Sequence, residues 1–256
     1  MNFWLFCFAM NELTHILRIS YDGTEYFGWQ KQPNVPTVQG VIEHSLRKLF
    51  GKEIKTVGAS RTDRGVHAID QVVSFVAPKR YEPKDLMRRL NKMLPADIAV
   101  WDSIVTEKTF NARFDCEGKI YRYRIFKRKK ALEARFGWWY EGELDINLLG
   151  GLAELILGEH DFRVFSIQKD LPENPRCTIF EAYWREFEDK LQFFIFGDRF
   201  LHKMVRSLVG AMVAVCGKQI SDTDFRKMLY EGVRVSEFRN APPHGLCLLE
   251  VKARLP

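Results

Sequence analysis

The chain has 256 residues, of which 46% are hydrophobic and 28% charged, so it can bury a substantial core and has an ordinary globular composition. Lys and Arg outnumber Asp and Glu by 39 to 33, and the formal charge of +6 favours either a phosphate-bearing partner or a merely solvated basic surface. Five scattered cysteines, with no C-x-x-C pair and no histidine at ligand spacing, indicate reduced thiols, a cytosolic location and no structural zinc.

The apolar start MNFWLFCFAM is too short to span a bilayer and lacks the features of a signal peptide. A strand pattern begins soon after Met10. Residues 1–9 are therefore either a translation-start artefact or a disordered extension, because chain ends that nothing holds are commonly disordered.

The first half alternates strand and helix patterns. Residues 17–21, LRISY, alternate apolar and polar side chains, which predicts a half-buried strand. Thr37 can cap a helix whose apolar residues recur at helical spacing until Gly51 ends it. Further patterns predict a strand near 53–57, a strand at 71–77, a helix at 83–94 and a strand at 98–105.

The second half continues this alternation. Residues 119–127, KIYRYRIFK, have apolar side chains on both faces, which predicts a strand within a covered sheet. Other patterns predict a helix within 145–157, strands at 180–187 and 190–196, a long helix starting near Phe200 and a final strand at 245–253.

Segregated strands and hairpins with helices packed on them indicate an α+β fold with mainly antiparallel pairing. The two halves have similar element content. We therefore expect two related subdomains, an N-terminal one over residues 10–112 and a C-terminal one over 113–256, with a cleft between them.

The stretch GASRTDRGVHA, residues 58–68, places Asp63 between Arg61 and Arg64. An arginine beside a carboxylate favours its ionised form, ready to act as nucleophile or base, although a surface turn with a weak salt bridge fits these residues too. Gly58 and Gly65 would allow a sharp turn and a close approach to a ligand.

In the helix pattern LHKMVRSLVGAMVAVC, Arg206 falls on the polar face, where it could meet Asp63 or simply be solvated. The other members of that face are His202, Lys203 and Gly210.

Tyr121 is a core residue by default, but its many basic neighbours would suit a platform on which an unpaired base stacks. Arg88, Arg89 and Lys92 form a second basic cluster suited to phosphates. The chain has no G-x-S-x-G, no G-x-x-x-x-G-K-[ST] and no G-x-G-x-x-G, which disfavours a serine hydrolase, an NTPase and a dinucleotide enzyme.

Six blocks occur in an order and spacing that resemble the tRNA pseudouridine synthase A family: YDGTEYFGWQ, VPTVQGVIEHSL, SRTDRGVHA, KIYRYRI, FLHKMVRSLVG and APPHGLCLLEV. The resemblance covers nearly the whole chain, and the RTD-x-GVHA block is its most specific part. It implies an α+β fold of two subdomains, a homodimer, no cofactor, and isomerisation of uridine to pseudouridine in the tRNA anticodon stem-loop, at positions 38 to 40.

Carried over by position, Asp63 resembles the family's catalytic aspartate and Arg206 the arginine that pairs with it. Tyr121 resembles the tyrosine that stacks on the target uracil, and Leu246 lines the same pocket. Arg61 shapes the loop or contacts the RNA. Remaining candidates for RNA contact are Arg64 beside the site and, for the RNA backbone, Arg88, Arg89, Lys92 and Lys203.

Two positions depart from the commonest bacterial pattern. Ser60 stands where glycine is usual and Arg64 where a small residue is usual, which resembles the archaeal or eukaryotic branch. The alternatives that stay open are a pseudouridine synthase for another RNA site and a catalytically silent tRNA-binding factor.

Overall fold

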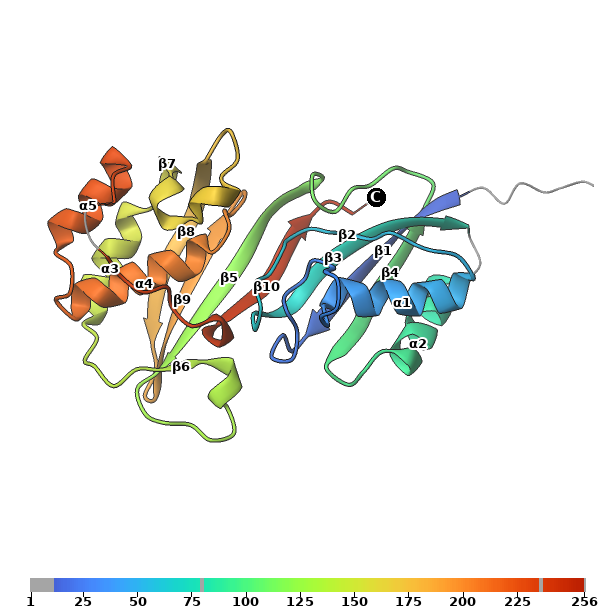
Figure 1. Ribbon diagram of the computed structural model, residues 1–256, viewed down its shortest axis with the longest axis horizontal. Coiled ribbons are helices and arrows are strands. Elements are labelled where there is room, and N and C mark those ends of the chain that lie inside the picture. The colour runs from blue at the N-terminus through green and yellow to red at the C-terminus, as the bar shows by residue number, and fades with distance from the viewer. Residues whose placement is uncertain (1–11, 79–80, 235–236, 256) are drawn as a thin grey trace, which may run out of the picture.

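The structure is a computed structural model that describes residues 12–78, 81–234 and 237–255, so the predicted extension over residues 1–9 lies outside it. Within these ranges the chain forms one ten-stranded sheet with five α-helices (Figure 1). The strands are β1 (Glu12–Tyr21), β2 (Val57–Gly58), β3 (His67–Pro78), β4 (Ile98–Thr106), β5 (Cys116–Phe126), β6 (Trp138–Trp139), β7 (Gly158–Asp161), β8 (Arg176–Glu186), β9 (Lys190–Gly197) and β10 (Leu246–Ala253). The helices are α1 (Val38–Phe50), α2 (Pro83–Met93), α3 (Ile146–Leu155), α4 (Met204–Cys216) and α5 (Asp222–Glu231).

The strand order is β4-β1-β3-β10-β5-β9-β8-β7, with β2 beside β3 and β6 beside β5. Pairing is antiparallel except between β10 and β3 and between β5 and β6, which confirms the predicted α+β class with mainly antiparallel strands. Strand β10 comes late in the chain but lies between β3 and β5. It therefore joins the strands of the first half to those of the second in one continuous sheet.

The helices lie over one face of this sheet. Tyr21, Ala68, Leu248 and Tyr121 occupy directly opposed positions on β1, β3, β10 and β5, so their side chains share a face. On that face Tyr121 contacts Phe200, just before α4, with ring centroids 5.2 Å apart. In the first half, His15 of β1 contacts Phe50 of α1 in the same way, at 5.7 Å.

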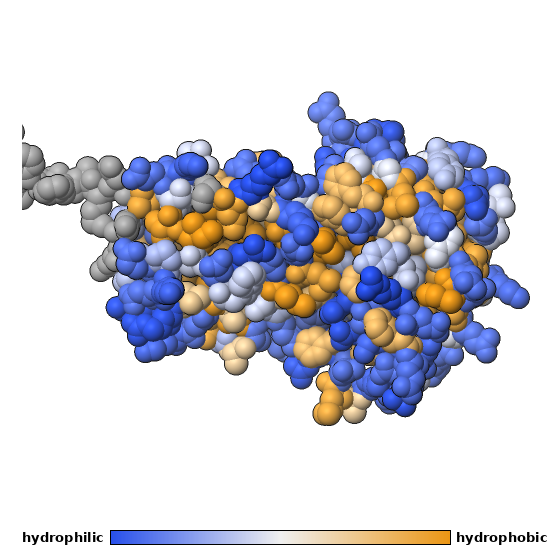
Figure 2. Space-filling model, turned by 180° about the vertical axis from the view of Figure 1, so that it is seen from behind, coloured by the Kyte–Doolittle hydropathy of each residue, from blue (hydrophilic) through white to orange (hydrophobic). Residues whose placement is uncertain are grey.

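In the described parts of the chain, no α-helix lies on the opposite face (Figure 1). On this face hydrophobic side chains are exposed among charged ones (Figure 2). The exposed hydrophobic residues include Val76, Trp101 and Phe180. Arg122 and Arg124 of β5 are half-buried on this face. The prediction that β5 lies in a covered sheet is met only in part on this face, because Phe126 is 1% exposed whereas Ile120, Arg122 and Arg124 are half-buried.

The predicted helix over residues 38–50 begins and ends where the sequence places it. Thr37 is its N-cap and accepts a hydrogen bond from the Gly40 N–H, and Gly51 ends it with φ of 71°. Helix α4 begins at Met204, later than predicted, because Lys203 has φ of 64° and interrupts the helical backbone. The patterns also predict neither α5 nor β7.

Strand β2 is shorter than the predicted strand over residues 53–57. The backbone N–H of Thr56 donates to the Glu43 carboxylate of α1, and its carbonyl accepts from the Gln39 amide. Side chains of α1 thus satisfy the groups that a strand would pair with a neighbour.

The division into subdomains 10–112 and 113–256 stays a prediction. Within the described ranges no helix is both long and apolar enough to cross a bilayer.

Leu248 tests how strongly the sheet depends on β10. Its side chain is fully buried, so Leu248→Ala should lower the free energy of unfolding by about 2–5 kcal/mol. The matched control is Leu132→Ala, because Leu132 is 95% exposed and should contribute little. Urea denaturation measures both variants, and equal losses would contradict this placement of β10.

Candidate active site

Asp63 lies in the loop that connects β2 to β3, and the backbone of this loop is held on both sides. The Trp29 N–H donates to the Thr62 carbonyl at 3.0 Å, and the Gly65 N–H donates to the Tyr26 carbonyl at 3.3 Å. The Thr62 hydroxyl also pairs with the buried Tyr21 hydroxyl at 2.8 Å. Asp63 therefore projects from a fixed turn.

Glycine permits the closest of these contacts. Gly28 has φ of 93°, and a Cβ atom at this position would lie 2.6 Å from the Thr62 carbonyl oxygen. Any other residue would strain its own backbone and push the Asp63 loop away. Gly65 makes the expected sharp turn with φ of 78°, while the expected close approach of Gly58 and Gly65 to a ligand stays a prediction.

The Asp63 carboxylate lies between the guanidinium of Arg206 and the imidazole ring of His202. Arg206 Nη1 lies 2.6 Å from Oδ2, and His202 Nε2 lies 3.3 Å from Oδ1. Burial raises the pKa of Asp63, but the hydrogen bond from His202 and the charge and hydrogen bond of Arg206 outweigh it and hold this pKa below its ordinary value. The carboxylate is thus ionised at neutral pH.

Arg206 is itself held in place. Its Nε–H donates to the Ala241 carbonyl at 2.8 Å, and the Ala241 N–H donates to the Arg206 carbonyl at 3.0 Å. Gly210, one turn further along α4, is buried, and a Cβ atom there would lie 2.1 Å from the Arg239 carbonyl oxygen. The segment before β10 therefore packs directly on α4 and fixes the guanidinium.

His202 was not singled out by the sequence as a partner of Asp63. Its Nδ1 lies 2.6 Å from Asp170 Oδ2, while its Nε2 faces Asp63. The only sequence signal for His202 is its spacing of four residues from Arg206, which predicts that His202 and Arg206 lie on one face of a helix. His202 lies instead in the turn before α4, and no pattern connected it with Asp170.

Tyr121 is buried, with 5% of its surface exposed. Its hydroxyl pairs with the Ser60 hydroxyl at 2.6 Å, so the aromatic ring is tied to the same loop that carries Asp63. Leu246, also buried, begins β10 and lies opposite Tyr123 of β5. The structure thus gathers Asp63, Arg206 and Tyr121 around the junction of β3, β10 and β5.

The two arginines of the loop are exposed. The Arg64 guanidinium lies over the Phe27 ring, 4.1 Å from its centroid, and Phe27 is itself 37% exposed. Arg61 is also exposed beside the carboxylate. Both cations can therefore reach a ligand that approaches Asp63.

The other basic candidates divide into two groups. Arg88 and Arg89 of α2 both pair with Asp85, at 2.6 and 2.7 Å, and α2 packs on the edge strand β4. Lys92 is exposed on the same helix. Lys203 instead follows His202 directly. Lys203 is thus next in the chain to a residue that contacts Asp63, while the α2 cluster belongs to the far edge of the sheet.

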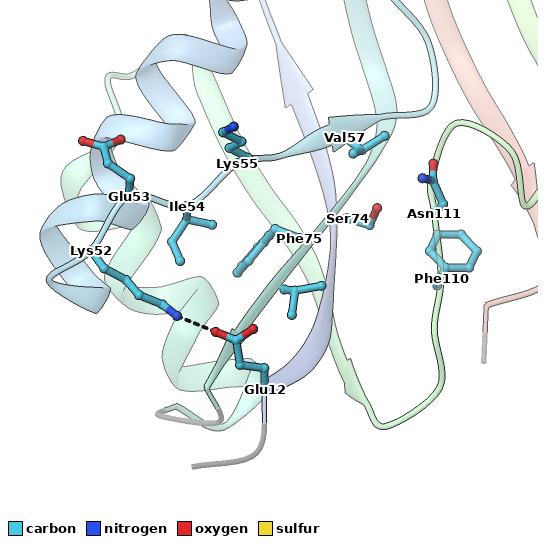
Figure 3. A pocket seen from close by; sticks show the side chains of 11 residues that line it. Glu12, Lys52, Glu53, Ile54, Lys55, Val57, Ser74, Phe75, Phe110 and Asn111 are labelled. Atoms are coloured by element: carbon cyan, nitrogen blue, oxygen red, sulfur yellow. Dashed lines mark hydrogen bonds and ion pairs between the residues drawn. The ribbon is translucent and has the colours of Figure 1, made fainter. Parts of the chain in front are cut away.

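A pocket of about 350 Å³ lies elsewhere, beside the other end of β3 (Figure 3). Its lining includes Ser74, Phe75 and the Lys52–Glu12 ion pair, and none of the candidate site residues. In the described parts of the chain no group of three or more His, Cys, Asp or Glu side chains is arranged to hold a metal ion.

Chemically, the Asp63 site offers one ionised carboxylate that Arg206 and His202 fix, with the ring of Tyr121 tied to the same loop and two exposed arginines on that loop. Such a carboxylate can attack a carbon centre, stabilise positive charge or take a proton. The exposed arginines suit a phosphate-bearing ligand.

Comparisons with known proteins agree on one family. The family model described as tRNA pseudouridine synthase matches residues 18–115 and 152–252. A tRNA pseudouridine synthase A from Methylacidiphilum infernorum is 37% identical over 238 residues, which are 92% of this chain and 93% of that protein. One from Caldicellulosiruptor bescii is 33% identical over 238 residues, 92% of this chain and 98% of that protein.

Among solved structures, a Cbf5-Nop10-Gar1 complex is similar with a TM-score of 0.38 and 11% sequence identity, over 92% of this chain and 58% of that chain. This similarity is too low to carry an argument about function.

Arg206→Met should lower the free energy of unfolding by about 3 kcal/mol near pH 7, because it leaves the Asp63 charge half-buried with only His202 beside it. The lowered pKa means that the pair stabilises the fold above the ordinary carboxyl pKa and that this stability is lost as pH falls through the folded value. The destabilisation should therefore shrink toward acid pH. Denaturation curves over a pH series measure it.

Arg226→Met is the matched control, since Arg226 pairs with Asp222 on an exposed helix face and should change stability little. A loss of equal size in both variants, or a loss independent of pH, would contradict the electrostatic account.

Proposed function

The chain belongs to the tRNA pseudouridine synthase family, and from that premise we propose that it modifies uridines of the anticodon stem-loop, at positions 38 to 40, with Asp63 as its catalytic residue. Membership makes it an isomerase that converts uridine in tRNA to pseudouridine. The observation that supports the proposal for Asp63 is its position as an ionised carboxylate fixed by Arg206, with the exposed residues Arg61 and Arg64 on the same loop.

The reaction conserves the atoms of the nucleoside apart from proton exchange. The bond from uracil N1 to C1′ breaks, the base rotates, a bond from C5 to C1′ forms, and the proton on C5 leaves while N1 gains one. No oxidant or cofactor is needed. Asp63 can serve by attack at C1′, by addition to the base or by removal of the C2′ proton, and its fixed ionised state suits each route.

The target base must leave its stack, which costs a few kcal/mol that a pocket with an aromatic surface offsets. We assign Tyr121 and Leu246 to that pocket. Because Tyr121 is only 5% exposed, a uracil can stack on its ring only if a neighbour such as Phe200 moves aside. Leu246 would help to exclude water, since hydrolysis of the detached sugar would leave an abasic site.

Arg61, Arg64 and Lys203 are the cations best placed to hold RNA around the target. Arg64 and Phe27 together present a charged group over an aromatic ring beside Asp63, which suits a neighbouring nucleotide. Arg88 and Arg89 would have to exchange Asp85 for a phosphate, so we expect them, with Lys92, to contribute less.

A homodimer is proposed from the resemblance alone, and a cytoplasmic location from the scattered cysteines. The relation to the archaeal or eukaryotic branch, which Ser60 and Arg64 suggest, also stays a prediction, because whole-chain similarity to the curated relatives does not test it.

Asp63→Asn should abolish turnover while leaving tRNA binding intact, because an amide is neither a nucleophile nor a base under these conditions. Transcript tRNA labelled with tritium at uracil C5 reports the reaction, since isomerisation must release that hydrogen. Asp85→Asn, on the distant helix α2, is the matched control and should keep its activity. Tritium release by Asp63→Asn at the wild-type rate would exclude Asp63 as the catalytic group.

The target positions are tested by chemical mapping of pseudouridine in treated tRNA. We expect new pseudouridine only at positions 38 to 40, and none in a transcript whose uridines there are replaced by cytidine. Modification confined to another part of the tRNA would favour a synthase for another site. Binding without modification of any RNA would favour the silent binding factor.

A further inference from the structure

We propose that His202 is a positioning residue that holds Asp63 as an imidazolium and is itself fixed by Asp170. The inference rests on the proposed catalytic role of Asp63. It gives a role in the site to His202 and Asp170, which are not among the site residues that the family resemblance implies.

The geometry favours a protonated ring. Nε2 of His202 lies 3.3 Å from Asp63 Oδ1, and Nδ1 lies 2.6 Å from Asp170 Oδ2. Ionised carboxylates only accept hydrogen bonds, whereas neutral imidazole has a single N–H. Only the imidazolium can donate to both carboxylates at once. Loss of its proton would leave a ring lone pair facing one of the two carboxylates.

The position of the ring is set by its backbone. His202 lies in the turn between Leu201 and Lys203, which is closed by a hydrogen bond from the Met204 N–H to the Leu201 carbonyl at 3.0 Å. The His202 carbonyl accepts from the Ser166 hydroxyl at 3.1 Å and from the Ile167 N–H at 3.3 Å. Asp170 follows directly, at the end of the 3-10 turn Gln168–Asp170. One short segment thus holds both the backbone and the ring of His202.

His202 and Arg206 hold different oxygens of one carboxylate and differ in two respects. Arg206 is 12% exposed and keeps its charge at every relevant pH, whereas His202 is 40% exposed and titrates. Arg206 therefore maintains the ionised state of Asp63. His202 adds a second anchor that fixes the orientation of the carboxylate and that is removed when its proton is lost.

The charged groups around His202 favour its protonation. Asp63 faces it from the loop before β3 and Asp170 from the 3-10 turn, while Lys203 and Arg206 of its own segment oppose the added charge. The hydrogen bond to Asp63 raises the pKa of His202, burial opposes it, and the bond to Asp170 adds to the rise. The second anchor is therefore present below this raised pKa and is lost as pH rises through it.

The first test uses the free protein and no RNA. Histidine side-chain resonances followed by nitrogen-15 NMR should show His202 titrating above its ordinary pKa of 6.5 in the wild-type protein and closer to it in Asp170→Asn. Assignment comes from loss of the signal in His202→Gln. If His202 titrates at or below its ordinary pKa, the proposal is overturned, whatever the enzyme does to tRNA.

The second test measures single-turnover tritium release across pH. The wild-type rate should fall on the alkaline side, and His202→Gln should lack this limb and lose about tenfold in rate at neutral pH with little change in RNA affinity. Asp170→Asn should move the limb to lower pH. His44→Gln, a change at an exposed position of α1, should behave as wild type.

If His202 has only a structural role, His202→Gln will lower the free energy of unfolding, but its rate of tritium release will still fall at alkaline pH. This result would overturn the proposal. Absence of tritium release from the wild-type protein would instead refute the proposed function, while the NMR titration would still decide whether His202 couples to Asp63 and Asp170.

Discussion

A carboxylate withdrawn from water must have cationic partners, and this constraint organises the molecule around Asp63. With 15% of its side chain exposed, Asp63 would favour the neutral form if it stood alone. Together with His202, Arg206, 143 residues further along the chain, reverses that preference. The rest of the architecture brings these two side chains together, since the Asp63 loop precedes β3, Arg206 belongs to α4, and the segment after α4 leads into β10 beside β3.

Close backbone contacts fix the geometry of the Asp63–Arg206 ion pair. At Gly28 the chain approaches the carbonyl that precedes Asp63, and at Gly210 helix α4 approaches the segment that binds the Arg206 guanidinium. Both contacts lack room for a Cβ atom. The carboxylate and the guanidinium are thus each supported by backbone rather than by flexible side chains, which is the preorganisation that catalysis by a single group requires.

The sequence predicted local features well where one residue decides them. Thr37 and Gly51 set the ends of α1 through a side-chain oxygen and a left-handed backbone, both of which depend on residue type. The face of α4 that carries Arg206 followed from periodicity. Features that depend on distant partners were missed. Glu43 and Gln39 satisfy Thr56 and cut β2 short, and the partnership of His202 with Asp170 joins segments that share no pattern.

The placement of β10 has a consequence for how the protein is made. On the ribosome, β3 and β5 emerge long before the strand that must insert between them, and α4 must precede it too. Until then both strands present unpaired edges. The parallel pairing of β10 with β3 closes a loop of well over a hundred residues, a contact of the kind that forms slowly. The edges of β3 and β5 therefore stay open to faulty strand pairing until β10 is inserted, and assembly of the site around Asp63 and Arg206 depends on that late step.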